Sequence, residues 1–373
     1  MASLHPSPSA VNGTISIAPP ESLRSLARDV TKVLFRVPPR WRSPVLQNPF
    51  AFEAERRVVQ WFESLGCTPA EVARARKFDV AGYVGIPFPS LPFEKTVRTA
   101  KYLSLWLLWD DVQVETLDDH WRIEADDVLT DYRPEGMTRF DEGWWQLMQE
   151  FAVTHSPGWL DDLCQAMKTW NAAAVEEALM TQEYTESGVY PSFARQLDLR
   201  IATIGMYATI YMIEDAYDVE LPRAFHADPT VRRLKTLANA IVGLGNEILS
   251  FGKDSKERRL NLVSTLMYER GIFIDEAIDR LVRMHDEALE EYDRLADAVI
   301  DASGESEPII AQWLQDVRYA SLGFSLWESQ APRYTAHKVV DRGRIIEPKF
   351  SFFPPRLSER PIAERAPITM EKV

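Results

Sequence analysis

Apolar residues recur at three- and four-residue spacing along most of the chain, from about Glu21 to Arg333. This spacing puts apolar side chains on one face of a helix, and the alternation typical of half-buried strands is scarce. Proline and glycine gather between the periodic stretches, at 85–92, 156–158 and 303–304. The pattern predicts an all-α fold with a single helical body of about ten helices.

The two ends of the chain lack this periodicity. Residues 1–20 are rich in Ser, Pro and Ala, and residues 338–373 are rich in Pro. Such segments bury too little apolar surface to offset the entropy lost on ordering. We therefore expect a disordered N-terminal tail at 1–20, one helical domain at 21–337 and a Pro-rich C-terminal tail at 338–373.

Charge and cysteine content exclude several classes of protein. The 373 residues include 42 Lys and Arg and 56 Asp and Glu, a formal net charge of −14. This balance argues against binding to nucleic acid or to an anionic membrane surface. Two cysteines, Cys67 and Cys164, are too few for a disulfide scaffold or a zinc cluster. No run reaches the ~18 apolar residues of a membrane span, and residues 1–20 do not resemble a secretory signal, so we expect a cytoplasmic protein.

An acidic motif follows a long apolar helix that the pattern predicts at Phe93–Trp109. Asp110 and Asp111 come directly after this helix, and Glu115 lies four residues beyond Asp111, on the same predicted helix face. Carboxylates at the C-terminus of an apolar helix are unfavourable unless a cation balances them. Hard oxygen donors close together are the ligands that Mg²⁺ prefers. The chain has other acidic pairs, as at 118–119, 126–127 and 161–162, so a solvated surface pair remains the alternative.

A second polar motif lies in the helix predicted from Thr236 to about Ser250 and beyond. Asn246, Ser250 and Asp254 are spaced i, i+4 and i+8, which stacks them on one helix face. An amide oxygen, a hydroxyl and a carboxylate together suit one Mg²⁺. Lys253 beside them would direct a cation at any phosphate that the metal holds. The alternative is an ordinary polar surface face.

Together these motifs resemble those of the class I terpene synthases. That family carries an Asp-rich Asp-Asp-x-x-Asp/Glu motif and an Asn/Asp-x-x-x-Ser/Thr-x-x-x-Glu motif. Microbial members also carry an Arg about 46 residues before the Asn, where this chain has Arg200 (246 − 46 = 200), and an Arg-Tyr pair near the domain end, where it has Arg333-Tyr334. The single body is similar to the microbial, especially fungal, one-domain members.

Two positions depart from the family pattern. The fifth position of the Asp-rich motif is Val114, and the acid arrives one residue later at Glu115. Asp111 and Glu115 therefore both stay open as partners of Asp110. The second motif ends in Asp254 instead of Glu, which is one methylene shorter.

The resemblance implies ionisation of an allylic diphosphate with three Mg²⁺ ions. The implied metal ligands are Asp110, Asp111, Glu115, Asn246, Ser250 and Asp254. Donors to the diphosphate would be Arg200, Lys253, Arg333 and Tyr334. Gly205 would mark a helix break that directs a backbone carbonyl at the nascent cation, or would only allow close helix packing. Aromatic rings stabilise carbocations without attacking them, and the expected pocket residues are Trp106 and Trp327, followed by Tyr83, Phe88 and Tyr207.

The expected activity is cyclisation of a prenyl diphosphate, with farnesyl diphosphate and a sesquiterpene product favoured by family frequency. Geranyl and geranylgeranyl diphosphate stay open as substrates, and a homodimer is possible. A chain-elongating prenyltransferase would have a second Asp-rich motif where this chain has Asn246, Ser250 and Asp254. A class II cyclase would have an Asp-x-Asp-Asp motif, and a di-iron bundle would have Glu-x-x-His pairs, and the sequence has neither. A non-catalytic helical interaction protein would leave the order of the four motifs unexplained.

Overall fold

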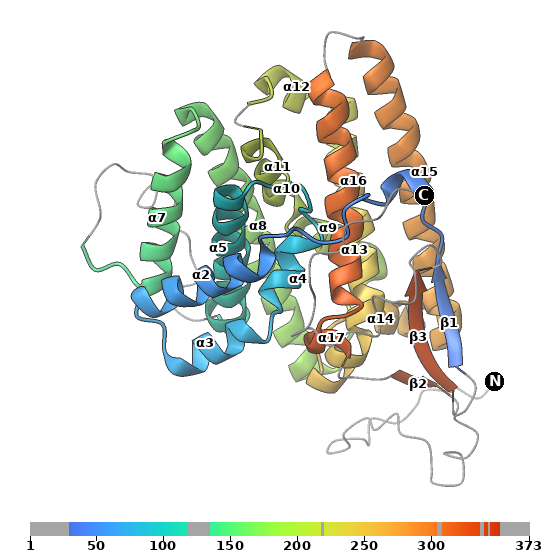
Figure 1. The fold of residues 1–373 in the computed structure, drawn as a ribbon. Coiled ribbons are helices and arrows are strands. Elements are labelled where there is room, and N and C mark those ends of the chain that lie inside the picture. Colours follow the sequence, from blue (N-terminus) through green and yellow to red (C-terminus); the bar gives the residue numbers. More distant parts are fainter. Residues whose placement is uncertain are drawn as a thin grey trace, which may run out of the picture.

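The computed structural model describes residues 30–117, 135–217, 220–303, 308–335, 339–341 and 344–350. These residues form a bundle of helices with one small sheet at its edge (Figure 1), so the all-α prediction is confirmed. Within the described part of the chain, no helix combines the length and the apolar character that crossing a membrane requires. The tail predicted at residues 1–20 lies outside the described residues.

The helices have the following bounds. They are η1 (Pro39–Trp41), α2 (Ala51–Ser64), α3 (Pro69–Arg76), α4 (Val80–Gly85), α5 (Phe93–Trp109), η2 (Asp110–Val114), α7 (Arg139–Ala152), α8 (Pro157–Ser187), α9 (Phe193–Thr203), α10 (Met206–Thr209), α11 (Tyr211–Asp215), α12 (Arg223–Ala227), α13 (Pro229–Glu257), α14 (Leu262–Arg270), α15 (Ile274–Ser303), α16 (Pro308–Glu328) and α17 (Pro332–Thr335).

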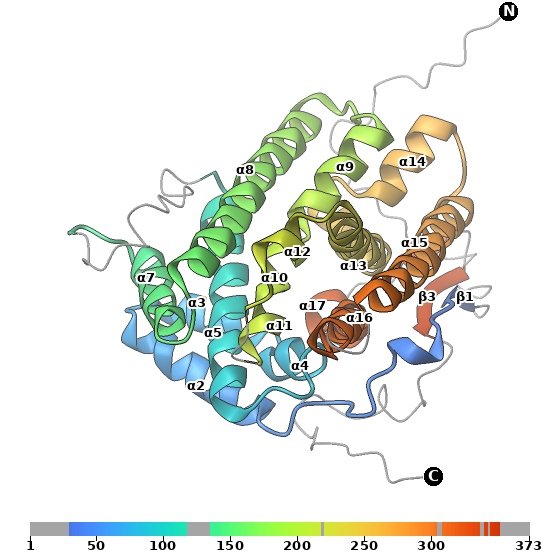
Figure 2. The same cartoon turned by 90° about the horizontal axis from the view of Figure 1, so that it is seen from above.

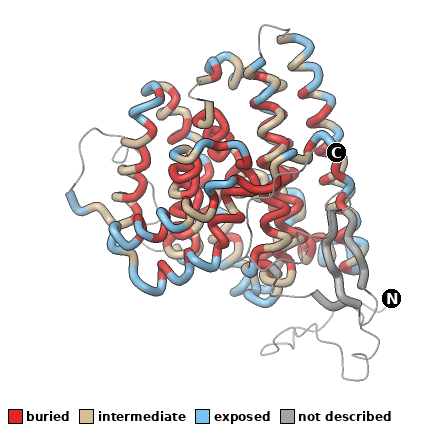
Figure 3. Tube along the Cα trace, in the orientation of Figure 1, coloured by how far each residue is buried: buried red, intermediate tan, exposed pale blue. Residues whose placement is uncertain are grey.

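The long helices stand side by side around a common interior. Helix α13 packs against both α15 and α16, α5 packs against α2 and α7, and α8 packs against α9 (Figure 2). Buried residues lie mainly on the sides of these helices that face the interior, and exposed residues mainly on the outer sides (Figure 3). The burial follows from the amphipathic pattern, because one apolar stripe on each helix is removed from water.

Local sequence signals explain where α13 begins and where α8 begins and ends. Helix α13 begins at Pro229, and the carboxylate of Asp228 before it accepts a hydrogen bond from the backbone N–H of Thr230 at 2.7 Å. Helix α8 begins at Pro157 after the N-cap Ser156 and ends at Gly188, which has a φ of +71°. Capping by Asp or Ser, proline in the first turn and glycine past the end are the usual boundary signals of helices.

The small sheet joins the two ends of the described chain. Strand β1 (Val30–Phe35) pairs in parallel with β3 (Arg344–Phe350), and β2 (Val339–Asp341) pairs with β3 in the antiparallel direction. The sheet lies beside α15 (Figure 1). The helical pattern did not predict β1, and the tail predicted at 338–373 contains both β2 and β3. The domain boundaries themselves stay a prediction.

Helix α9 ends at Thr203 and α10 begins at Met206, and Gly205 stands at the break between them. Its φ of +88° lies in the left-handed region that favours glycine. A Cβ atom at this position would lie 3.3 Å from the ring of Trp106 on α5, a tight approach. The helix break predicted at Gly205 is therefore present, and the backbone there lies close against an aromatic ring.

Candidate active site

A cavity of about 230 Å³ opens between α5, α8, α13, α16 and the α9–α10 break. The structure brings most of the candidate residues to its walls. They are Tyr83, Trp106, Asp110, Glu115, Arg200, Gly205, Asn246, Ser250, Lys253, Asp254, Trp327, Arg333 and Tyr334. Asp111, Phe88 and Tyr207 do not line it.

The acidic motif lies in one turn of π-helix. In η2 the N–H of Glu115 donates to the carbonyl of Asp110 at 2.9 Å, a bond that spans five residues in place of the α-helical four. This wider turn puts Asp110 and Glu115 on the face that lines the cavity and turns Asp111 away from it. Asp111 therefore does not line the cavity as Glu115 does, although one oxygen of each still lies within 4.8 Å of the other, so the predicted proximity of the two acids holds.

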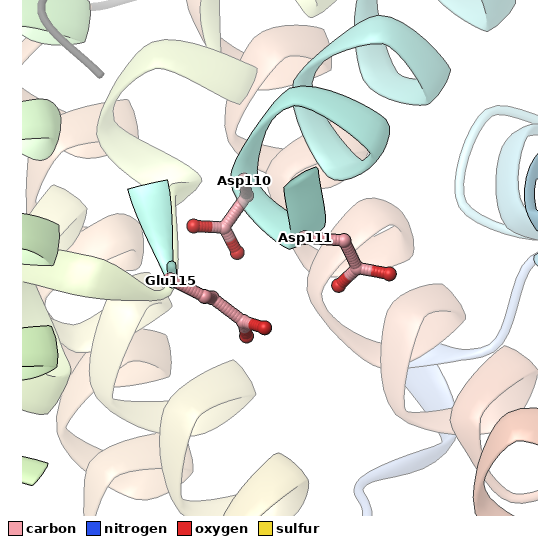
Figure 4. Close-up of side chains that lie close together, drawn as sticks. All are labelled: Asp110, Asp111 and Glu115. Carbon is pink, nitrogen blue, oxygen red and sulfur yellow. The ribbon is translucent and has the colours of Figure 1, made fainter. Parts of the chain in front are cut away.

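The three carboxylates still form one cluster at the end of α5 (Figure 4). One oxygen from each of Asp110, Asp111 and Glu115 lies within 4.8 Å of the others. Oxygen donors at this separation can surround a divalent cation. Burial and the nearby charge of Glu115 hold the pKa of Asp110 well above its usual range.

Two of the three carboxylates are held by arginines. Arg333 makes a two-pronged ion pair with Asp111, with Nη1 and Nη2 at 2.8 and 2.9 Å from its oxygens. Burial opposes ionisation of Asp111, but this hydrogen-bonded pair lowers its pKa below the usual value. Glu115 accepts hydrogen bonds from both terminal nitrogens of Arg259. Within the described residues, the carboxylate of Asp110 has no ion pair or hydrogen bond.

The second motif is built into a hydrogen-bond network on α13. Asn246, Ser250 and Asp254 are all buried and line the cavity from one helix face, as their spacing predicted. The hydroxyl of Ser250 donates to the carboxylate of Asp254 at 2.5 Å. Asn261, beyond the end of α13, donates to Asp254 at 2.9 Å and to the carbonyl of Glu247 at 2.9 Å. These bonds fix the carboxylate and the hydroxyl in place.

Arg200 reaches the same face of α13 from α9. Its guanidinium donates to the amide oxygen of Asn246 and lies 2.8 Å from the carboxylate of Glu247. The amide nitrogen of Asn246 donates in turn to Glu328 at 2.6 Å. Burial raises the pKa of Glu247 to about 7 and that of Glu328 to about 8. The cation and its acceptors therefore lie in a poorly solvated wall of the cavity.

Aromatic rings form the rest of the wall. Trp106 meets Trp170 edge to face at 4.8 Å, and the indole N–H of Trp170 donates to the carbonyl of Thr203 at 2.6 Å. On the opposite side Tyr83 lies 4.3 Å from Trp327, measured between ring centroids. Because the indole N–H groups of both Trp170 and Trp327 are bound to backbone carbonyls, these rings offer mainly apolar faces.

Two of the expected pocket residues lie outside the cavity. Phe88 is buried behind the wall, in edge contact with Phe324. Tyr207 lines a separate hollow and its hydroxyl lies 3.0 Å from that of Thr236. Helix α10 turns Met206 and Thr209 to the cavity, so Tyr207 faces the other side. Lys253 lines the cavity, and its burial lowers its pKa.

Several residues of the cavity wall were not among the predicted site residues. They are Trp170, Glu177, Glu247, Arg259 and Glu328. Glu247 and Glu328 each follow a residue that was singled out, Asn246 and Trp327, and could have been found by extending those motifs. Arg259 lies five residues past Asp254. Residues five apart do not share a face of a continuous α-helix, and no other sequence signal points to Arg259.

Comparison with known proteins identifies consistent relatives. The family model of terpene synthase family 2, C-terminal metal binding, matches residues 101–291, just over half of the chain. The chain is 25% identical over 311 residues to 10-epi-cubebol synthase of Sorangium cellulosum, which covers 77% of this chain and 94% of that protein. It is 23% identical over 226 residues to sesquiterpene synthase 6 of Postia placenta, covering 57% of this chain and 64% of that protein.

A solved structure shares the same fold. Linalool/nerolidol synthase from Streptomyces clavuligerus superposes with a TM-score of 0.68 at 18% identity, covering 79% of this chain and 99% of that one. At this level of identity the likeness concerns the arrangement of the helices. It agrees with the region that the family model matches, which includes both polar motifs.

Proposed function

Because the chain belongs to terpene synthase family 2, with its C-terminal metal-binding region, we propose that it cyclises farnesyl diphosphate in a Mg²⁺-dependent reaction. A class I terpene synthase is a lyase that acts on prenyl diphosphates, and this chain is one. The observation that carries the proposal is a cavity with charged groups at one end and aromatic rings at the other. This division matches a substrate with an ionic head and a hydrocarbon tail.

The donor set fits divalent cations. Among the described residues, the cavity wall holds six carboxylates, Asp110, Glu115, Glu177, Glu247, Asp254 and Glu328, against four cationic side chains, Arg200, Lys253, Arg259 and Arg333. Burial and then the charges of Glu115 and Asp111 raise the pKa of Asp110, and a bound cation would favour its charged form. Asp110 on one side and Asn246, Ser250 and Asp254 on the other would hold Mg²⁺, whose chemistry there is to neutralise charge on the departing diphosphate.

The residues of this chain have separate tasks in the proposed reaction. Arg200, Lys253 and Arg333 carry N–H donors at the charged end, where the C–O bond to the diphosphate breaks and negative charge develops. Tyr334 adds a hydroxyl there. At the other end Trp106, Trp170 and Trp327 exclude water and offer ring faces to the carbocation.

The farnesyl chain length rests on the relatives. The name of the Postia placenta protein states a sesquiterpene product, and a sesquiterpene is built from fifteen carbons. We extend that substrate class to this chain as part of the proposal. Cytoplasmic location and a homodimer remain expectations from the sequence.

The test is gas chromatography of the hydrocarbon extract after incubation with Mg²⁺ and geranyl, farnesyl or geranylgeranyl diphosphate, each alone. A cyclic fifteen-carbon product from farnesyl diphosphate, lost when EDTA is added, is the expected result. Cyclic products from another chain length would correct the substrate. A longer prenyl diphosphate, formed only when isopentenyl diphosphate is added, would overturn cyclisation in favour of chain elongation.

A further inference from the structure

Glu115 and Arg259 meet across the charged end of the cavity. Glu115 follows η2 at the end of α5, and Arg259 follows α13, 144 residues later in the chain. Both terminal nitrogens of Arg259 donate to the two carboxylate oxygens of Glu115. The side chains are 25% and 30% exposed, and both line the cavity. The pair therefore connects the ends of the two helices that carry the polar motifs.

The backbone after α13 is shaped to present this arginine. Arg258 has a φ of +57°, a left-handed conformation that a residue other than glycine rarely adopts. The turn lets the N–H of Arg259 donate to the carbonyl of Asp254 at 2.8 Å. The side chain then leaves the helix axis and reaches the end of α5. Burial alone would lower the pKa of Arg259, but the hydrogen bonds and charge of Glu115 raise it above the usual value.

The pairing bears on which acid assists Asp110. Glu115 uses both of its oxygens on a guanidinium, so its charge is balanced within the protein. Asp110, on the same face of the π-turn, has no such partner among the described residues. Two carboxylates on one face thus differ in what they need: Asp110 needs a cation, and Glu115 already has one.

We propose that Glu115 is a positioning residue for Arg259, a further donor to the diphosphate of the substrate, and is not a metal ligand. The inference rests on the proposed function, since it needs a diphosphate substrate at this end of the cavity. A guanidinium has five N–H donors in a fixed fork. Two bind Glu115 and the Nε–H lies 3.5 Å from Glu257, which leaves two for phosphate oxygens. Arg259 therefore binds the substrate, and Glu115 holds the guanidinium group of Arg259 in position.

The experiment measures two quantities for each variant: the dissociation constant of inorganic diphosphate at saturating Mg²⁺, and the Mg²⁺ concentration that gives half-maximal diphosphate binding. Arg259→Gln should weaken diphosphate binding about tenfold, the usual effect of losing a hydrogen bond to a charged group. Glu115→Gln should weaken it less. Its half-saturating Mg²⁺ concentration should stay within about twofold of wild type, because losing a ligand typically has a larger effect.

A double-mutant cycle separates positioning from an independent role. If Glu115 acts through Arg259, the double variant Glu115→Gln with Arg259→Gln binds diphosphate no more weakly than Arg259→Gln alone. Glu115→Asp, which keeps the charge, should recover most of the affinity. A rise of about tenfold in half-saturating Mg²⁺ for Glu115→Gln, with additive losses in the cycle, would show that Glu115 holds metal and would overturn the proposal.

Two controls are available in the chain. Glu276→Gln removes an exposed carboxylate that pairs with Arg280 on α15 and does not line the cavity, and it should change neither quantity by more than about twofold. Arg233→Gln breaks a comparable two-pronged pair with Glu291 on the surface. Comparing the melting temperatures of the other variants with that of Arg233→Gln shows whether they have lost stability in general. Wild-type protein that binds diphosphate but makes no terpene would contradict the proposed function while leaving the cycle interpretable. Wild-type protein that does not bind diphosphate would contradict both.

Discussion

The two polar motifs face each other across one cavity but are held together by different forces. At the end of α5, Asp111 and Glu115 are fixed by arginines 222 and 144 residues away in the chain. On α13, Ser250 and Asp254 bind each other and Asn261, all within eleven residues. The first motif is held by ion pairs. In the second motif Ser250 and Asp254 are held by short-range hydrogen bonds, and Asn246 bonds to distant residues, Arg200 and Glu328.

The difference shows how each side can respond to a bound cation. The α13 donors are largely neutral and already oriented, so their geometry depends little on whether a metal is present. Two of the three α5 carboxylates, Asp111 and Glu115, are paired with guanidinium groups. Asp110 is the described member of that cluster without an ion pair, and burial together with the charge of Glu115 raises its pKa. Asp110 would therefore balance the charge of a bound cation, and the residues on α13 would supply ligands that are already oriented.

Asp110→Asn should have the largest effect on turnover, a loss of about 10³-fold, because it removes the uncompensated charge on which electrostatic stabilisation depends. Initial rates of diphosphate release across a Mg²⁺ titration would measure it. Asp161→Asn, at an exposed carboxylate on α8, is the control. If Asp110→Asn keeps normal rates, the charge-balance role is wrong.

Asn246→Ala should lower turnover by about 10²-fold. It removes one neutral ligand and also leaves Arg200 and Glu328 without their shared hydrogen-bond partner. Single-turnover ionisation of farnesyl diphosphate is the measurement. Unchanged ionisation would refute the assignment of Asn246 as a metal ligand. It would also contradict the role given to the α13 motif in this comparison.

Asp111→Asn should cost about tenfold in turnover, since Asp111 acts by orienting Arg333. The loss should show as weaker diphosphate binding, with half-saturating Mg²⁺ little changed. A loss as severe as that of Asp110→Asn, accompanied by a higher Mg²⁺ requirement, would instead make Asp111 the metal partner of Asp110.

Asn261→Ala should have the smallest effect on rate and should mainly reduce stability, by about 1–3 kcal/mol, because buried acceptors lose their donor. Urea denaturation gives the free energy of unfolding, and Gln165→Ala on the exposed face of α8 provides the baseline. A turnover loss matching that of Asn246→Ala, with unchanged stability, would mean that Asn261 contributes directly to ligand geometry.

Local geometry explains which parts of the site were predictable. The i, i+4, i+8 spacing of Asn246, Ser250 and Asp254 needs only a continuous helix, and α13 supplies one. A continuous α-helix does not describe η2, where one π-turn brings Asp110 to the cavity wall beside Glu115, while Asp111 stays near Glu115 but pairs with Arg333. Nothing in the local sequence distinguishes the two geometries, because the choice depends on how α5 packs against the rest of the bundle.

Long-range features escaped prediction for a related reason. The break at Gly205 was expected, but the direction of Tyr207 depends on which side of α10 meets the cavity. Arg259 and Glu328 reach the cavity through contacts across the fold, which carry no periodic signal. Strand β1 gave no sequence pattern strong enough to predict it, because its pairing is made with β3 at the far end of the chain.

That pairing has a consequence for how the protein is made. Val30 pairs with Ile345, so the first strand to leave the ribosome must wait for 315 further residues (345 − 30). At ordinary rates of translation this delay is roughly 15 to 60 s, during which an unpaired strand edge is a template for other chains. A chain cut before residue 344 keeps every described cavity residue yet loses the partner of β1. We expect such a chain to self-associate, which size-exclusion chromatography against the full-length protein would reveal, although its catalytic groups are all present.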